Sequence, residues 1–135
     1  MSEADDLESI YLTLEDILEL YAAIIGGTTA QAGDQLRNHS GLESALDRPA
    51  THAHYERADL ATQAAVLAHG IAEGQPFLDG NKRLALVAML TFLEVNGFSV
   101  PVPDRQLADW VISLSTGTTP EELAERIRST RVPVE

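Results

Sequence analysis

Hydrophobic residues recur every three or four positions along most of this chain, which is the spacing of amphipathic helices. The segment from Thr13 to Ile25 shows the spacing first, and Gly26-Gly27 ends the helix that it predicts. Five further helices are predicted over residues 40–47, 59–72, 84–95, 104–116 and 120–129. The pattern therefore predicts an all-α protein of about six helices.

Residues that cap helices stand where these segments begin. A hydroxyl residue followed three positions later by an acidic residue, the spacing of a capping box, occurs at Thr13, Ser40 and Thr119. Asp59 and Asp104 supply carboxylates at the start of two other helices. The predicted boundaries thus rest on capping chemistry as well as on periodicity.

Several stretches lack helical spacing and are predicted as connections. Residues 28–39 are polar and form a predicted loop. Arg48-Pro49 is predicted to end the short helix before it, because the residue preceding a proline disfavours helical geometry. Residues 50–55 then form a connection, and the Val-Pro-Val-Pro stretch over residues 100–103 must be extended.

A single compact domain over residues 11–130 accounts for the helical part of the chain. The whole chain has 135 residues, 44% of them hydrophobic, which suffice for one buried core. Residues 1–10 are predicted as a loose acidic arm and residues 131–135 as a C-terminal tail. Residues 84–95 are apolar almost all round, so their helix belongs in the middle of the bundle.

Composition narrows the class of protein and its partners. No apolar run approaches the roughly 18 residues of a membrane span, and the first six residues are acidic where a signal peptide is basic. The chain contains no cysteine, which excludes disulfides and thiolate metal sites and agrees with a soluble cytoplasmic protein. A net charge of −12 argues against direct nucleic-acid binding.

A polar turn with phosphate-binding chemistry lies between the two central helices. Gly80 and Asn81 precede the helix, whose first N–H groups have no internal acceptor and attract anions. Lys82 and Arg83 can add charge-assisted hydrogen bonds, and Asp79 can hold Mg²⁺ against phosphate oxygens. These residues suit phosphoryl or nucleotidyl transfer, although a simple capped turn would also contain them.

Two histidines occur two positions apart, at His52 and His54, in the predicted connection. A zinc site there would require ligands from elsewhere in the chain, because two histidines cannot complete a tetrahedral site. An ordinary polar loop is the simpler interpretation.

The turn QPFLDGNKR resembles the signature loop of the Fic/Doc superfamily. That loop reads His-Pro-Phe-x-Asp/Glu-Gly-Asn, followed by Gly-Arg in the Fic branch and Lys-Arg in the Doc (death-on-curing) branch, so Lys82 is similar to Doc. The segments YLTLEDILELY, LRNHSGLESALDRP and LALVAMLTFLEVNGF also resemble Doc-type toxins. The resemblance implies a Fic/Doc-type helical bundle with the loop between two central helices.

The resemblance implies a Doc-like toxin that uses ATP or another nucleoside triphosphate with Mg²⁺ to phosphorylate a translation elongation factor, restrained by a cognate antitoxin. Gly80, Asn81, Lys82 and Arg83 would then hold phosphate and Asp79 the metal. The Fic branch implies the alternative of AMP transfer to a protein hydroxyl. Thr118 with Glu122 is followed by Leu123, so the inhibitory Fic motif Ser/Thr-x-x-x-Glu-Gly/Asn is absent from this sequence.

The chain departs from the family pattern at Gln75, where the family has the general-base histidine. A glutamine amide can orient a hydroxyl but cannot accept its proton near neutral pH. Three explanations are open: a natural, catalytically weak or inactive binding module, an engineered inactivation, or a substitute base among His69, His52 and His54. A purely structural helical domain would require the loop match to be accidental.

Overall fold

The computed structural model describes residues 9–134. The predicted acidic arm therefore lies outside the described residues except for its last two positions. In the described part, Ile10 is tied to the body of the protein by hydrogen bonds between its backbone N–H and C=O and the side chain of Asn96, 2.8 and 2.9 Å long.

Helices make up most of the described chain, which confirms the predicted all-α class. They are α2 (Leu14–Ile25), α3 (Thr29–Asp34), α4 (His39–Glu56), α5 (Leu60–Gly74), α6 (Asn81–Val95), α7 (Asp104–Ile112) and α8 (Pro120–Thr130), with a 3₁₀ turn at Ser113–Ser115. Two short strands, β1 (Phe98–Ser99) and β2 (Val132–Pro133), pair in antiparallel fashion. The segment predicted as a C-terminal tail thus contributes β2.

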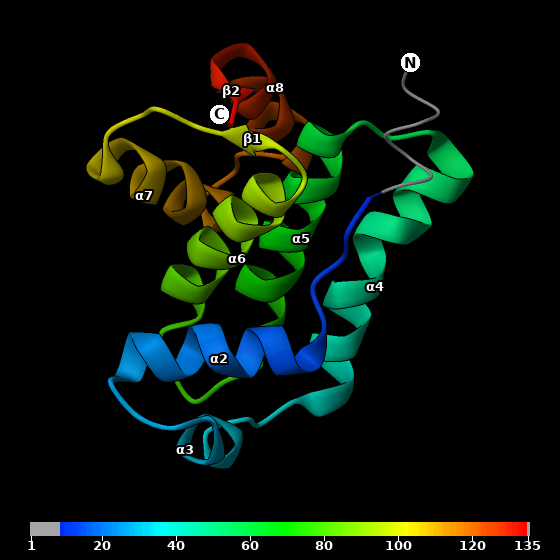
Figure 1. The fold of residues 1–135 in the computed structure, drawn as a ribbon. Helices are drawn as coiled ribbons and strands as arrows, with labels where there is room; N and C mark the ends of the chain where they lie inside the picture. Colours follow the sequence, from blue (N-terminus) through cyan, green and yellow to red (C-terminus); the bar gives the residue numbers. More distant parts are fainter. Residues whose placement is uncertain (1–8, 135) are drawn as a thin grey trace.

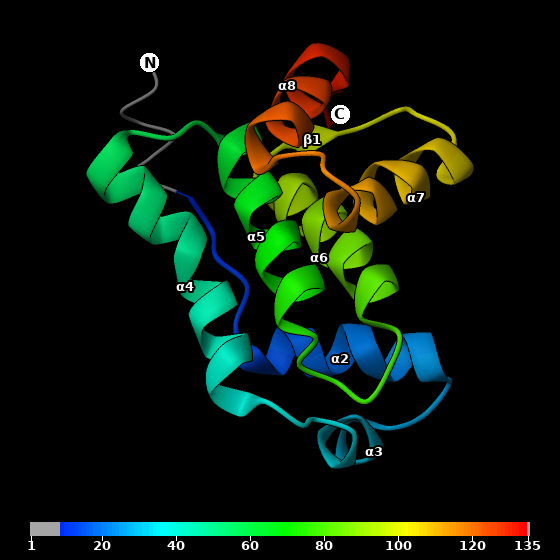
Figure 2. The ribbon, with the colours of Figure 1, turned by 180° about the vertical axis from the view of Figure 1, so that it is seen from behind.

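Helices α5 and α6 lie side by side at the centre of the molecule, as Figures 1 and 2 both show. Helices α4 and α8 pack against α5, α7 packs against α6, and α2 crosses the ends of the central pair where the connecting loop lies. Figure 2 shows this loop in front of α2, so it faces the side opposite to the view of Figure 1. The predicted position of the signature loop, between two central helices, is confirmed.

The central position of α5 follows from its small residues. Its buried side chains include four alanines, and Gly70 lets α4 approach so closely that a Cβ atom there would lie 3.0 Å from Cβ of Ala45. Ridges of small side chains allow helix axes to pack at short distance. Helix α5 is consequently buried along most of its length by its neighbours.

The boundaries predicted around Pro49 are wrong. Helix α4 begins after Asn38, whose side chain accepts the Gly41 N–H, so Ser40 lies inside the helix instead of capping it. The helix then passes through Pro49 and continues to Glu56. A proline removes one backbone hydrogen bond, but Pro49 is buried and α4 packs along α5, so tertiary packing overrides the local preference. His52 and His54 consequently lie on a helix.

The loop predicted over residues 28–39 is also partly wrong, because it contains α3. Thr28 caps this helix, its hydroxyl accepting the Gln31 N–H while the Gln31 side chain accepts the Thr28 N–H. The Thr-x-x-Gln spacing of a capping box was therefore present in the sequence. The buried Ala32 anchors this short helix, which packs against α2.

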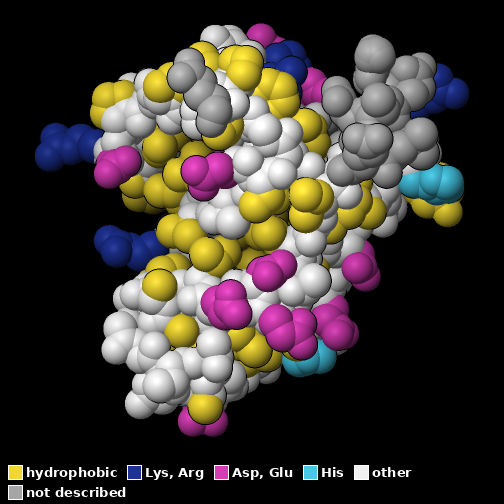
Figure 3. All heavy atoms as spheres, viewed as in Figure 1, with side chains coloured by type: hydrophobic (Ala, Val, Ile, Leu, Met, Phe, Trp, Pro, Cys, Tyr) yellow, Lys and Arg dark blue, Asp and Glu magenta, His cyan; other side chains and the backbone are white. Residues whose placement is uncertain are grey.

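Acidic and hydrophobic side chains occupy different areas of the face shown in Figure 3. Acidic side chains gather over α2, whereas hydrophobic side chains gather over the middle of the face. The loop between α5 and α6 faces the other side of α2 (Figure 2), away from those carboxylates. Between residues 9 and 134, no helix combines the length and the apolar character needed to cross a bilayer.

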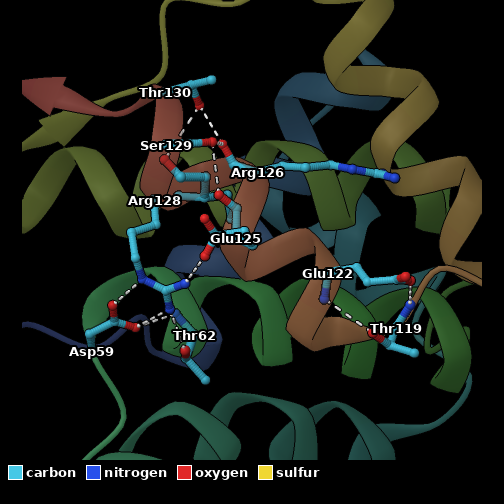
Figure 4. Close-up of polar contacts among 10 residues, drawn as sticks. Asp59, Thr62, Thr119, Glu122, Glu125, Arg126, Arg128, Ser129 and Thr130 are labelled. Carbon is cyan, nitrogen blue, oxygen red and sulfur yellow. Dashed lines mark hydrogen bonds and ion pairs between the residues drawn. The ribbon is translucent and has the colours of Figure 1, made fainter.

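A bidentate ion pair fastens α8 to the start of α5 (Figure 4). The Arg128 guanidinium donates to both carboxylate oxygens of Asp59, over 2.8 and 3.1 Å, and also to Glu125 and Thr62. Asp59 additionally caps α5 by accepting the Thr62 N–H. The hydrogen bonds from Arg128 hold the pKa of the Asp59 carboxyl well below its usual range, and those to Asp59 raise the pKa of Arg128.

Replacing Asp59 by asparagine is expected to lower the free energy of unfolding by about 1 kcal/mol at pH 7, because the amide can cap α5 but cannot pair with Arg128. The folded pKa of Asp59 is depressed, so its contribution is complete above the unfolded pKa of about 3.9 and is lost as pH falls through the folded pKa. Urea unfolding at pH 7 and pH 3 measures the difference.

The matched control is Arg128→Met, in which Asp59→Asn should cost nothing further because the ion pair is already absent. An equal cost of Asp59→Asn at both pH values, or in both backgrounds, would show that the ion pair does not fasten α8 to α5.

Candidate functional site

The loop that joins α5 to α6 begins at an exposed glutamine. Gln75 is the C-cap of α5, and its backbone has left-handed dihedral angles, φ 46° and ψ 59°. Its N–H still donates to the Ile71 carbonyl over 3.0 Å, so its backbone is held by the helix while its side chain faces solvent. The position that carries the base in the Fic/Doc pattern is therefore accessible to an external substrate.

The loop is held on one side by the segment between α3 and α4. The Pro76 carbonyl accepts the N–H groups of Arg37 and Asn38, over 2.7 and 3.0 Å, and the Leu78 N–H donates to Gln35 over 3.0 Å. These hydrogen bonds form a short antiparallel bridge beside the loop. The first half of the turn thus has a fixed backbone before any ligand binds.

The side chain of Asn81 closes the turn from inside. Its Oδ1 accepts the Phe77 N–H over 2.9 Å, and its Nδ2 donates to the Phe77 carbonyl over 3.0 Å. Only 9% of Asn81 is exposed, and Phe77 itself is buried. The side-chain amide of Asn81 therefore holds the loop, while its backbone N–H has no protein acceptor among the described residues, so phosphate binding by Asn81 stays a prediction.

A second buried residue supports the turn from α2. The ring of Tyr21 stacks on Phe77 with centroids 4.0 Å apart and planes inclined by 15°. Its hydroxyl donates to the Asp79 carbonyl over 2.9 Å. Burial raises the pKa of Tyr21, and the charge of Asp79 raises it further, so the hydroxyl keeps its proton at neutral pH. The sequence pattern places Tyr21 within the helix predicted from Thr13 to Ile25 and gives it no role at the loop.

The second half of the turn presents a set of donors to solvent. Among residues 9–134, no protein group accepts a hydrogen bond from the backbone N–H of Gly80, Asn81, Lys82 or Arg83. Gly80 precedes α6 with φ 75°, and it has no side chain that could cap the helix. The 15-residue helix directs the positive end of its dipole at these donors, which is the arrangement that binds anions.

Charged side chains surround these donors. Lys82 and Arg83 are exposed in the first turn of α6, and Asp79 is exposed immediately before it. None of the three forms an ion pair with another described residue. N–H donors and two cations of this kind suit a nucleotide phosphate, and the Asp79 carboxylate is the residue of this group that could hold a magnesium ion.

The histidines considered as substitute bases lie elsewhere. His52 and His69 line a pocket of about 370 Å³ between α4, α5 and the start of α8, which contains no residue of the loop. His69 precedes Gln75 by six residues, which separates them by about 9 Å along the helix and roughly 120° around it. Each histidine faces a glutamate on its own helix, Glu56 at 3.0 Å and Glu73 at 3.9 Å.

His54 packs edge-on against the exposed ring of Tyr55, with centroids 4.6 Å apart. Within residues 9–134, no group of three or more histidine, aspartate or glutamate side chains is arranged to hold a metal ion. Among the described residues, His52, His54 and His69 therefore form no metal site, and the pocket that His52 and His69 line does not include the loop.

Comparison with known proteins identifies relatives of this chain. Residues 11–93 match the model of the Fic/DOC family, a range that includes α2, α5, the loop and most of α6. The chain is also 34% identical over 91 residues to the toxin Doc of Mycolicibacterium smegmatis (strain ATCC 700084 / mc(2)155). That match covers 64% of this chain and 65% of the relative, so it spans just under two thirds of the relative's length.

Proposed function

Because the chain belongs to the Fic/DOC family, in its Doc branch, we propose that it is a Doc-like toxin that binds a nucleoside triphosphate at Asp79–Arg83. The observation that carries this proposal is the set of outward backbone N–H groups from Gly80 to Arg83, which have no protein acceptor. Such donors at the start of a helix bind phosphate without any rearrangement of the backbone.

Each residue of the loop has a distinct role in this proposal. The backbone of Gly80 and Asn81 cradles the phosphates, and Lys82 and Arg83 neutralise their charge. Asp79 would hold Mg²⁺, which would supply charge neutralisation during transfer. The acceptor is a hydroxyl of a target protein, which we propose to be a translation elongation factor. A cytoplasmic address and a cognate antitoxin follow from the same assignment.

Transfer of the γ-phosphoryl group requires that the attacking hydroxyl lose its proton as the new P–O bond forms, the bond between the γ-phosphorus and its bridging oxygen breaks, and the nucleoside diphosphate leaves. The amide of Gln75 can accept a hydrogen bond from that hydroxyl but cannot take the proton. This observation favours a second candidate function, a binding module that retains the nucleotide site and binds antitoxin or target without modifying it. In both cases the phosphate site is the same.

Millimolar MgATP is expected to raise the melting temperature of the protein, and Lys82→Ala is expected to reduce that shift. A ligand at 100 times its Kd stabilises the folded state by about 2.7 kcal/mol, and removal of one charged contact to phosphate typically costs 1.5–3 kcal/mol, roughly ten- to a hundredfold in affinity. Differential scanning fluorimetry over a range of MgATP concentrations measures both effects.

Arg105→Ala is the matched control, because Arg105 is an exposed cation on α7, remote in sequence from the loop. It should leave the MgATP shift unchanged. Absence of any shift in the unaltered protein, together with no effect of Lys82→Ala, would reduce the site to a capped turn and refute the proposed nucleotide binding.

A further inference from the structure

We propose that Tyr21 is a positioning residue for the nucleotide site: its hydroxyl fixes the peptide group between Asp79 and Gly80 so that the Gly80 N–H points at the bound phosphate. The proposal rests on the proposed function and names a residue outside the signature loop that controls it. The tyrosine lies on α2, 58 positions before Asp79 in the sequence.

The contacts of Tyr21 place both its ring and its hydroxyl against the loop. Only 1% of Tyr21 is exposed, and its ring stacks on Phe77 at 4.0 Å. The stacking determines where the hydroxyl lies, and the hydroxyl donates to the Asp79 carbonyl over 2.9 Å. Tyr21 is therefore a buried side chain whose ring is fixed by stacking and whose hydroxyl contacts one particular peptide group.

The orientation of that carbonyl determines the orientation of the next N–H. A trans peptide group is planar, and its C=O and N–H point in opposite directions. No cis peptide bond occurs in the described chain. Since the Asp79 carbonyl points toward Tyr21, the Gly80 N–H points away from Tyr21, and no described protein group accepts a hydrogen bond from it.

Without the hydroxyl, this peptide group has little else to hold it. Gly80 has φ 75°, and glycine populates both signs of φ with similar ease, so the preceding peptide can rotate at low cost. The other hydrogen bonds of the turn act on Pro76, Phe77 and Leu78, and on the Gly80 carbonyl, which belongs to the next peptide group and accepts the Leu84 N–H. Among the described residues, Tyr21 alone holds the Asp79 carbonyl.

The test compares two tyrosines that differ in location but have similar contacts. Tyr21→Phe keeps the ring and its stacking on Phe77 and removes the hydrogen bond to Asp79. Tyr11→Phe removes a hydroxyl that donates to Gln63 over 3.1 Å, from a ring 5.9 Å from that of Phe92. Both variants lose one hydrogen bond of a stacked tyrosine, so a general loss of stability affects both.

Tyr21→Phe is expected to weaken MgATP binding about three- to tenfold, the loss that corresponds to one hydrogen bond, while Tyr11→Phe leaves it unchanged. Isothermal titration gives the affinities. Labelling the nine glycines with ¹⁵N adds a readout that a merely structural role would not change, because the Gly80 amide resonance should shift on MgATP addition and shift less in Tyr21→Phe.

The outcomes separate this inference from the proposed function. If the unaltered protein does not bind MgATP, the proposed function fails. If it binds but the Gly80 resonance does not move, or if Tyr21→Phe binds as tightly as Tyr11→Phe, the positioning role of Tyr21 is overturned. If Tyr21→Phe does not fold, the Gly80 resonance of the unaltered protein still tests the proposal, because a resonance that does not move on MgATP addition overturns it.

Discussion

Replacing Gln75 by histidine is expected to raise the rate of phosphate transfer to the target about 10²–10⁴-fold, the usual contribution of a positioned general base. Gln75 is exposed, and its left-handed backbone is one that histidine adopts more readily than most residues, so the substitution should leave the fold unchanged. Transfer of labelled phosphate from γ-labelled ATP to elongation factor, and growth arrest on expression, measure the gain.

The control for this experiment is Gln75→Asn, which keeps an amide, tolerates the same backbone and supplies no base. It should behave as the unaltered chain. Equal activity of the glutamine and histidine forms would mean that another base operates, and inactivity of both would refute the toxin assignment. Activity of the histidine form alone would identify the present chain as an inactive member of its family.

Replacing Asn81 by alanine is expected to lower the free energy of unfolding by about 2–4 kcal/mol, because it leaves the buried N–H and C=O of Phe77 without partners. The turn should lose its shape as well, so the MgATP-induced rise in melting temperature should largely disappear. Urea unfolding gives the first quantity and scanning fluorimetry the second.

Asn96→Ala is the matched control on the same helix, because the Asn96 amide also bridges backbone groups, at Ile10 and Phe92. Asn96 lies at the other end of α6 and is more exposed, so this substitution should cost less stability and leave nucleotide binding intact. If Asn96→Ala abolished the MgATP shift to the same degree, the effect of Asn81→Ala would reflect general destabilisation instead of loss of the turn.

Much of the fold could be predicted because local chemistry and tertiary packing agree there. Thr13, Asp59 and Thr119 cap the helices that periodicity predicts, and the apolar segment from Leu84 to Val95 lies in a central helix. At Pro49 the two disagree. The local preference is to end the helix, but packing along α5 continues it.

The location of the candidate site could be predicted from the sequence, but the separate structural roles of its residues could not. The spacing of the loop predicts that its donors meet at one helix end, and they do. It cannot reveal that the amide of Asn81 is occupied by Phe77, or that Tyr21 reaches Asp79 from another helix. Both contacts depend on how the turn folds over α2, which residue identity alone does not specify.

The left-handed backbone at Gln75 has a consequence for which side chains this position can accept over evolutionary time. Residues branched at Cβ are strained at φ 46°, whereas asparagine, aspartate and histidine are enriched in this region. The helix end therefore accommodates the histidine that the Fic/Doc pattern has at this position with no more backbone strain than glutamine has there.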